Sequence, residues 1–117
     1  LQTTGRATAL KLVPESPKWQ ADGMDLQYVR VYAVDSRGRH VPTAKGTVTF
    51  DVTGAARLIA VDNGDQVSDE LFAGPQRRLH NGSALCILRS DRTAGTVRIA
   101  ASAAGLRTAE IELETIK

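Results

Sequence analysis

The sequence predicts an all-β domain, an antiparallel sandwich of about seven or eight short strands. Three observations support this prediction. The chain has ten glycines, most of them 8 to 10 residues apart, and turn residues at this spacing are typical of sandwiches and barrels. The segments between them alternate apolar and polar residues, as half-buried strands do. No segment carries a sustained apolar repeat of 3.6 residues, so no long helix is expected.

The size of the chain fits one domain with its own core. It has 117 residues and a mass of 12.5 kDa, with 42% hydrophobic and 24% charged residues, close to the globular average. This composition excludes a disordered tail, and no apolar run approaches the ~20 residues of a membrane span. We therefore treat 1–117 as a single domain. Because it begins with Leu1 and its only methionine is Met24, we expect a domain of a longer chain or a mature product.

Four strands are expected in the first half of the chain. In 9–13 both leucines fall on one face, and Pro14 ends the strand because it lacks a backbone N–H. In 26–35 two valines and an alanine share one face, opposite two tyrosines and an arginine. The range 47–53 alternates Val and Phe with Thr and Asp, and 57–61 is a short apolar run.

Three more strands are expected in the second half. The range 83–89 is apolar at nearly every position, because Leu85 and Ile87 alternate with a second apolar set. This strand is therefore expected to be covered on both faces. The range 96–102 turns an arginine outward, and 108–113 alternates apolar residues with glutamates.

The connections carry recognisable turn chemistry. Residues 35–38 read Asp-Ser-Arg-Gly, a tight turn in which Asp bonds the backbone and Gly takes a positive φ. Asn81 and Gly82 suit a primed hairpin turn. Residues 91–95 are expected to join the flanking strands as a hairpin. The longest irregular stretch is 62–81, and loops of that length are usually functional or held against another element.

Charge does not favour nucleic-acid binding. The 15 Lys and Arg residues exceed the 13 Asp and Glu residues by two, and the pI is about 9.0. The cations are scattered along the chain, whereas nucleic-acid binders gather them on one face with aromatic residues between them. We expect neither a nucleic-acid partner nor membrane insertion.

No residue pattern predicts catalysis or a cofactor. Glu110, Glu112 and Glu114 share one strand face at a spacing of about 6.8 Å, and a flat face does not enclose a sugar between two carboxylates. The two histidines have no partner at zinc-ligand spacing. The single cysteine, Cys86, cannot form an internal disulfide and falls on an inward face, so it is interpreted as a small buried hydrophobe.

The acidic residues of the long stretch are a weak candidate for calcium. Asp62, Asp65, Asp69 and Glu70 supply oxygen ligands at short spacing. They do not form the 12-residue EF-hand loop, and Asp or Asn beside Gly more often forms turns. We predict no metal.

Aromatic residues are the sharper binding candidates. Tyr28 and Tyr32 lie four residues apart in one strand, so they share a face. They could pack against a neighbouring domain or present a platform to a glycan. Trp19 could join them, or it could cover one end of the core with its N–H bonded to a carbonyl. The candidate contact residues, for a neighbouring domain or a glycan, are Trp19, Tyr28, Tyr32, Asp62, Asn63, Asp65 and Phe72.

Several motifs resemble known modules. "ADG" at 21–23, "VRVYAVDSRG" at 29–38, "VP" at 41–42 and "VTF" at 48–50 resemble bacterial immunoglobulin-like modules, which include adhesin repeats and enzyme accessory domains. The second half then reads "AVDNGD", "ELF", "RRLHNG" and "ALCILRS" in order. Across about 7–113 the chain is similar to the C-terminal immunoglobulin-like domain of glycoside hydrolase family 2, the β-galactosidase-type enzymes of gut Bacteroides and relatives. Where this family more often has Val, the chain has Cys86.

The resemblance implies an immunoglobulin-like sandwich that is a non-catalytic accessory domain. In that family the catalytic glutamates lie on a separate barrel, and no segment here matches it, so no catalytic residue carries over. The implied partners are neighbouring domains of the same polypeptide, and the implied location is the periplasm or the cell surface. Two alternatives remain: a carbohydrate-binding module that tethers the enzyme to polysaccharide, and a spacer repeat of a surface adhesin.

Overall fold

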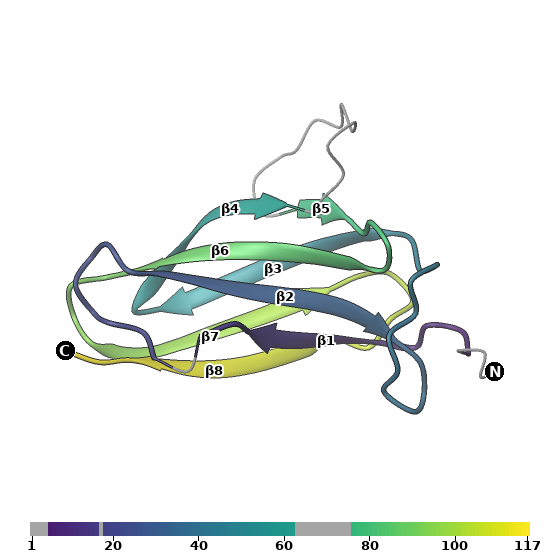
Figure 1. The fold of residues 1–117 in the computed structure, drawn as a ribbon, viewed down its shortest axis with the longest axis horizontal. Helices are drawn as coiled ribbons and strands as arrows, with labels where there is room; N and C mark the ends of the chain where they lie inside the picture. The colour runs from purple at the N-terminus through teal and green to yellow at the C-terminus, as the bar shows by residue number, and fades with distance from the viewer. Residues whose placement is uncertain (1–4, 17, 63–75) are drawn as a thin grey trace.

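The fold consists of two four-stranded sheets packed face to face (Figure 1). The computed structural model describes residues 5–16, 18–62 and 76–117. In these residues the strands are β1 (Ala9–Pro14), β2 (Leu26–Val34), β3 (Thr47–Gly54), β4 (Ala56–Asp62), β5 (Gln76–Arg78), β6 (Ser83–Ser90), β7 (Gly95–Ser102) and β8 (Ala109–Thr115). The first sheet has the order β1-β2-β6-β4 and the second β5-β3-β7-β8, with every strand pair antiparallel. The predicted all-β, immunoglobulin-like sandwich is confirmed.

Each of the seven expected strands is present, with ends within two residues of the expected ones. The eighth strand, β5, lies in the stretch that was expected to be irregular. It has three residues and pairs with Thr47, Val48 and Thr49 of β3. Because a three-residue edge strand needs no apolar face of its own, its sequence carries no alternation that could reveal it.

The prediction of a hairpin at 91–95 is wrong. The strands on either side, β6 and β7, belong to different sheets, so the segment crosses from one sheet to the other. The backbone N–H of Asp91 donates to the Ala55 carbonyl at 2.9 Å, which ties this crossing to the one between β3 and β4. Alternation reveals which face of a strand is buried, but both sheets bury a face in the same core. It therefore does not assign a strand to its sheet.

Gly54 makes the sharp crossing between β3 and β4 possible. Only Ala55 separates these strands, which lie in opposite sheets. Gly54 has a φ of 103°, and a Cβ at this position would collide with the Thr96 carbonyl oxygen and lie 3.3 Å from the Val97 Cα. The same oxygen accepts a hydrogen bond from the Ala55 N–H at 3.1 Å. Both the conformation and the space therefore require glycine.

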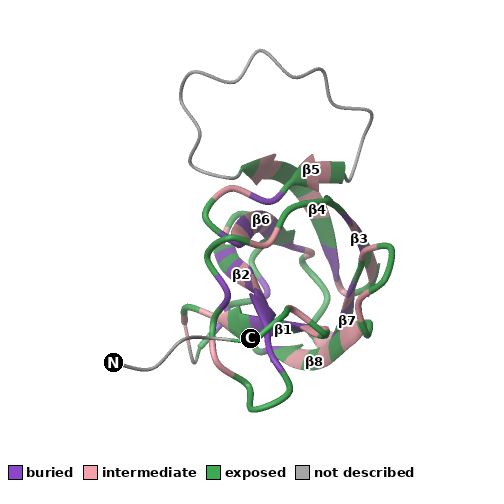
Figure 2. Ribbon diagram, turned by 90° about the vertical axis from the view of Figure 1, so that its right-hand side faces the viewer, coloured by how far each residue is buried: buried purple, intermediate pink, exposed green. Residues whose placement is uncertain are grey.

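The inward faces of the two sheets form one core, and Figure 2 shows buried segments on strands of both sheets. The buried apolar side chains are Leu10, Leu12, Trp19, Val29, Val31, Ala33, Val48, Phe50, Ala56, Leu79, Ala84, Cys86, Leu88, Val97, Ile99 and Ala101. Cys86 is among them, as the alternation predicts, and burial raises the pKa of its thiol to about 12. A thiol in this state is neutral and unreactive.

Gly54→Ala should destabilise the chain far more than Gly105→Ala. Both glycines have positive φ, but no atom lies within 4 Å of a Cβ built at Gly105. The free energy of unfolding of the Gly105 variant should therefore fall only by the cost of holding alanine in the left-handed conformation, about 1 kcal/mol. The Gly54 variant adds a backbone collision and should lose roughly 3 kcal/mol or more. Urea unfolding of both variants measures the difference, and equal losses would contradict the role of Gly54 in the crossing.

Candidate functional site

The outer face of the second sheet is polar and solvated. Its central feature is Arg98 of β7, whose guanidinium lies 3.3 Å from a Glu110 carboxylate oxygen and 3.0 Å from one of Glu112. The Thr96 hydroxyl donates to Glu114 at 2.7 Å. The hydrogen bond with Glu112, followed by the charge of Glu110, raises the pKa of Arg98. The three glutamates thus lie on one exposed strand face, as predicted.

The outer face of the first sheet carries apolar residues among charged ones. The register places Tyr28 of β2 beside Ile87 of β6, and Ile87 beside Ala60 of β4. This row is extended along and across the sheet by further apolar residues, among them Ile59 at the β4 bulge. We call the set the apolar band, and its members are Val13, Leu26, Tyr28, Ile59, Ala60, Leu85 and Ile87.

The contrast between the outer faces is sharp among the described residues. Val13, Leu26, Tyr28 and Ile59 are large apolar side chains that are 37 to 45% exposed, and all lie in strands of the first sheet. Over the described ranges, no strand of the second sheet has an exposed large apolar side chain. An exposed apolar surface of this kind marks an interaction site more often than an isolated exposed residue does.

The start of β2 inverts the usual inside–outside pattern. Gln27 is only 2% exposed, while its neighbours Leu26 and Tyr28 are 38% and 37% exposed. The buried amide is satisfied, because its oxygen accepts from the Ser16 N–H at 3.1 Å and its nitrogen donates to the Ser16 carbonyl at 2.9 Å. The chain therefore buries a polar side chain here and turns two large apolar ones outward.

The predicted contact residues differ in position and burial in the structure. Trp19 is 2% exposed and its indole N–H donates to the Asp25 carbonyl at 3.0 Å. It covers the core, the second of its two expected roles, so burial removes it from the surface contacts. Asp62 ends β4, exposed, opposite Leu85. Asn63, Asp65 and Phe72 lie outside the described residues, as do Asp69 and Glu70 of the calcium candidate.

Tyr28 and Tyr32 share the outer face of β2, as expected, but their surroundings differ. Tyr32 lies between Lys11 of β1 and Ser83 of β6. Its ring meets the ring of His40 in a T-shaped contact, with centroids 5.1 Å apart and planes at 70°. A groove of about 150 Å³ opens beside these rings. We call it the Tyr32 groove, and it is lined by Lys11, Val13, Tyr32, Val34, Gly38 and His40.

The turn that follows β2 is organised by Asp35, which is 4% exposed. One carboxylate oxygen accepts from the backbone N–H groups of Arg37 and Arg39 at 2.9 and 3.0 Å. The other accepts from the Gly5 N–H at 3.1 Å and contacts the Arg39 guanidinium at 3.3 Å. The backbone hydrogen bond from Arg39 is the main cause that lowers the pKa of Asp35 to about 2. The predicted turn is confirmed, and it leads directly into His40.

The predicted primed turn at Asn81 and Gly82 is also confirmed, since both have positive φ, 53° and 70°, and His80 and Ser83 exchange backbone hydrogen bonds across it. The strands on either side, β5 and β6, belong to different sheets, so the turn does not join a paired hairpin. This turn positions His40, whose Nε2 lies 2.9 Å from the Asn81 carbonyl oxygen. A carbonyl oxygen only accepts hydrogen bonds, so this contact assigns the proton to Nε2. Nδ1 of the neutral ring is then an acceptor.

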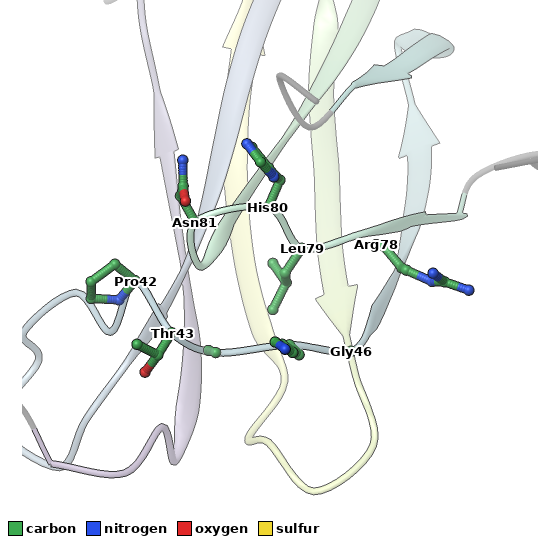
Figure 3. Close-up of a pocket in the computed structure, with 9 residues that line it drawn as sticks. Pro42, Thr43, Gly46, Arg78, Leu79, His80 and Asn81 are labelled. Atoms are coloured by element: carbon green, nitrogen blue, oxygen red, sulfur yellow. The ribbon is translucent and has the colours of Figure 1, made fainter. Parts of the chain in front are cut away.

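A second pocket, of about 620 Å³, lies between the segments 42–46 and 78–81 (Figure 3). In Figure 3 the side chains of His80 and Asn81 point away from the segment that carries Thr43 and Gly46. The polar groups therefore do not converge on one point, as a catalytic or anion-binding site requires. Elsewhere in the described part of the chain, no group of three or more His, Cys, Asp or Glu side chains is placed to hold a metal ion. The described residues also contain no helix long and apolar enough to cross a membrane.

Sequence reasoning identified the two tyrosines but missed most of the apolar band. Leu85 and Ile87 did give a signal, because their strand is apolar on both faces. Val13, Leu26 and Ile59 gave none, since a single apolar residue on an outward position is ordinary. They become a surface only when the sheet order brings their strands together.

Comparison with known proteins identifies relatives over nearly the whole chain. The family model described as glycoside hydrolase family 2 C-terminal domain 5 matches residues 10–112. A β-galactosidase of Bacteroides ovatus is 33% identical over 111 residues, which are 95% of this chain and 13% of the relative. A β-glucuronidase of Formosa agariphila is 32% identical over 121 residues, covering 98% of this chain and 12% of the relative.

A solved structure agrees with these relatives. It is a glycosyl hydrolase family 2 member from Bacteroides cellulosilyticus, with a TM-score of 0.93 and 30% identity. The match covers 100% of this chain and 15% of that chain. The chain thus spans about an eighth of the length of the curated relatives that it matches.

Asp35→Asn should lower the free energy of unfolding at neutral pH, because an amide retains only one accepting oxygen for the four donors around Asp35. The folded-state pKa of about 2 lies below the ordinary value of 3.8, so the carboxylate stabilises the fold above that ordinary value. This contribution is lost as the pH falls from about 4 toward 2. Denaturant unfolding should therefore show that the unfolding free energy of the wild type falls toward that of the variant in this pH window.

Asp51→Asn, on the exposed outer side of β3, is the matched control and should change the unfolding free energy at neutral pH by less than about 0.5 kcal/mol. A difference in unfolding free energy between wild type and Asp35→Asn that stays constant from pH 7 to about pH 2 would contradict the link between the Asp35 pKa and stability.

Proposed function

This chain belongs to the glycoside hydrolase family 2 C-terminal domain 5 family, and we propose that it is a non-catalytic accessory domain of a larger family 2 hydrolase. In this proposal the domain works by packing. The apolar band on its first sheet lies against a neighbouring domain of the same polypeptide and fixes the position of that domain. Relatives named as a β-galactosidase and a β-glucuronidase support a parent that hydrolyses β-glycosides, which we place in the periplasm or at the cell surface.

The share of the relatives that the chain covers supports an accessory role. About seven-eighths of each curated relative has no counterpart in this chain. Hydrolysis of a glycosidic bond uses two carboxylates that face each other across a cleft. The three glutamates of β8 share one exposed strand face with Arg98 between two of them. The described residues thus offer no such pair, and we assign the chemistry to the rest of the parent.

The single observation that carries the packing role is the contrast between the two outer faces. Both outer faces carry charged residues, on the first sheet Lys11, Arg30, Arg57 and Arg89. Over the described residues, however, only strands of the first sheet add exposed large apolar side chains, those of the apolar band. Complete burial of one Leu, Ile or Val side chain contributes roughly 1.5–3 kcal/mol. Covering the band therefore offers several kcal/mol of stabilisation. Covering the outer face of the second sheet would desolvate the Arg98 ion pairs, and the described residues of its strands offer no exposed large apolar side chain to offset that cost.

The burial of Gln27 between two exposed apolar side chains also supports the packing role of this face. In the isolated domain Leu26 and Tyr28 expose apolar surface to water while the amide of Gln27 between them is buried. The arrangement becomes favourable when a second surface removes these two side chains from water. Interfaces between domains of one chain commonly bury about 600–1,500 Å², an area that a four-stranded sheet face can supply.

Ile87→Lys should destabilise the domain inside the full-length parent but not on its own. In the 117-residue chain Ile87 is a partly exposed outer-face residue, so the variant should unfold within about 1 kcal/mol of wild type. In the parent the lysine would be buried against an apolar partner without a counter-charge, at a cost of about 2 kcal/mol or more. Differential scanning calorimetry of the parent should then show the domain unfolding as a separate, earlier transition.

Ala100→Lys is the matched control. Ala100 is also half-buried on the outer face of a central strand, but in the second sheet beside Asp51 and Glu110. Ala100→Lys should leave the unfolding of the domain unchanged, both in the parent and in the isolated chain. If Ile87→Lys also leaves the parent unchanged, or if it destabilises the isolated chain equally, the packing role of the apolar band is refuted.

A further inference from the structure

The outer face of the first sheet is not uniform along β2. At Tyr28 the neighbouring row is apolar, with Ile87 and then Ala60. At Tyr32 the row contains Lys11 on one side and Ser83 on the other. The chemistry therefore changes from apolar to amphipathic within four residues of one strand. The Tyr32 end combines an aromatic ring with hydrogen-bonding groups, which is the composition of a small-molecule site rather than of a packing surface.

The Tyr32 groove has walls in two orientations. The rings of Tyr32 and His40 stand at 70° with their centroids 5.1 Å apart, so they form a corner beside a space of about 150 Å³. A pyranose ring has an apolar C–H face and an edge of hydroxyl groups. An aromatic face matches the first, and the polar groups at the corner match the second.

The walls of the groove are fixed before any ligand binds. Tyr32 belongs to a strand that is paired on both sides. His40 follows the turn that Asp35 organises and is held through Nε2 by the Asn81 carbonyl at 2.9 Å. Side chains that are already ordered lose little conformational entropy on binding. The remaining His40 nitrogen, Nδ1, can accept a hydrogen bond from a sugar hydroxyl.

The charge of the groove indicates which sugars it favours. Of the six residues that line it, Lys11 alone carries a permanent charge. Its ammonium group can donate to hydroxyl groups, but it gains most from a carboxylate. We propose that the Tyr32 groove binds one pyranose ring of a carbohydrate, stacked on Tyr32, and prefers a uronic acid because its carboxylate pairs with Lys11. This binding activity does not depend on the packing role, although Val13 belongs to both the groove and the apolar band.

A titration of the 117-residue chain tests the proposal directly. The two ligands are an oligogalacturonide, which carries carboxylates, and a neutral β-galacto-oligosaccharide, both followed by backbone amide shifts in NMR. The oligogalacturonide should move the signals of Lys11, Tyr32 and His40, with a Kd of about 1 mM or below. The neutral sugar should bind the same residues roughly tenfold more weakly, and added salt should remove most of that difference.

Matched tyrosine variants locate the site. Tyr32→Ala should weaken binding of both sugars at least about tenfold, since it removes the stacking face. Tyr28→Ala changes the same residue type on the same face of the same strand and should leave sugar binding unchanged. Tyr32→Leu keeps apolar bulk against His40 and should also lose binding, which separates the loss of the aromatic face from a folding defect. Lys11→Gln should weaken binding of the oligogalacturonide and leave binding of the neutral sugar unchanged.

Several results would overturn the inference. The groove is not a sugar site if neither ligand moves these signals at about 10 mM, or if Tyr28→Ala weakens binding as much as Tyr32→Ala. Equal affinity for the two ligands, or an unchanged oligogalacturonide affinity in Lys11→Gln, would overturn the preference for a uronic acid. The calorimetric test of Ile87→Lys in the parent is independent of these outcomes, so failure of one proposal can be told from failure of the other.

Discussion

The register of β2 between β1 and β6 is the constraint on which the rest of the structure depends. Val29, Val31 and Ala33 have no exposed surface, and their positions decide that the tyrosines of β2 face outward. A slip of one residue would bring Arg30 and both tyrosines into the core and expose the valines. The cost of burying an unpaired guanidinium among apolar side chains excludes that alternative. The packing of the core therefore determines which side chains of β2 face outward as well as which are buried.

The same alternation has opposite consequences on the two sheets. In the second sheet the outward positions are filled by Thr, Asp, Arg and Glu, so the sheet has one buried and one solvated face. In β6 the two central outward positions are filled by Leu85 and Ile87, between Ser83 and Arg89, so the middle of the strand is apolar on both faces in a sandwich that has only one core. A strand of this kind calls for a second covering layer, and the described residues supply none. The packing role that we propose rests on this exposed apolar surface, to which Leu26 and Tyr28 on either side of the buried Gln27 contribute.

Local patterns predicted the strands and turns because these depend on residues that are close in sequence. The turn at Asp35, the primed turn at Asn81 and Gly82, and the inward faces of the strands are of this kind. The hairpin expected at 91–95 failed because the sheet to which a strand belongs depends on pairing with distant segments. The apolar band and the Tyr32 groove were out of reach for the same reason. Tyr28 and Tyr32 look equivalent in the sequence, and only the cross-strand neighbours Ile87 and Lys11 distinguish them.

Arg30 explains how the packing surface and the groove can coexist on one face. It lies between Tyr28 and Tyr32 on β2, 37% exposed, with its guanidinium 3.9 Å from the Glu15 carboxylate. A partner that covered Arg30 would have to desolvate this ion pair, and at 3.9 Å the pair lacks the close geometry that offsets such a cost. The favourable boundary of a docked domain therefore runs along Arg30, so Val13 and Leu85, which pair with Arg30 on either side, lie at the edge of the covered area. Tyr28, Ile87 and Ala60 lie on the covered side, and the Tyr32 groove, which shares Val13 with the apolar band, stays open to solvent at the other end of the strand.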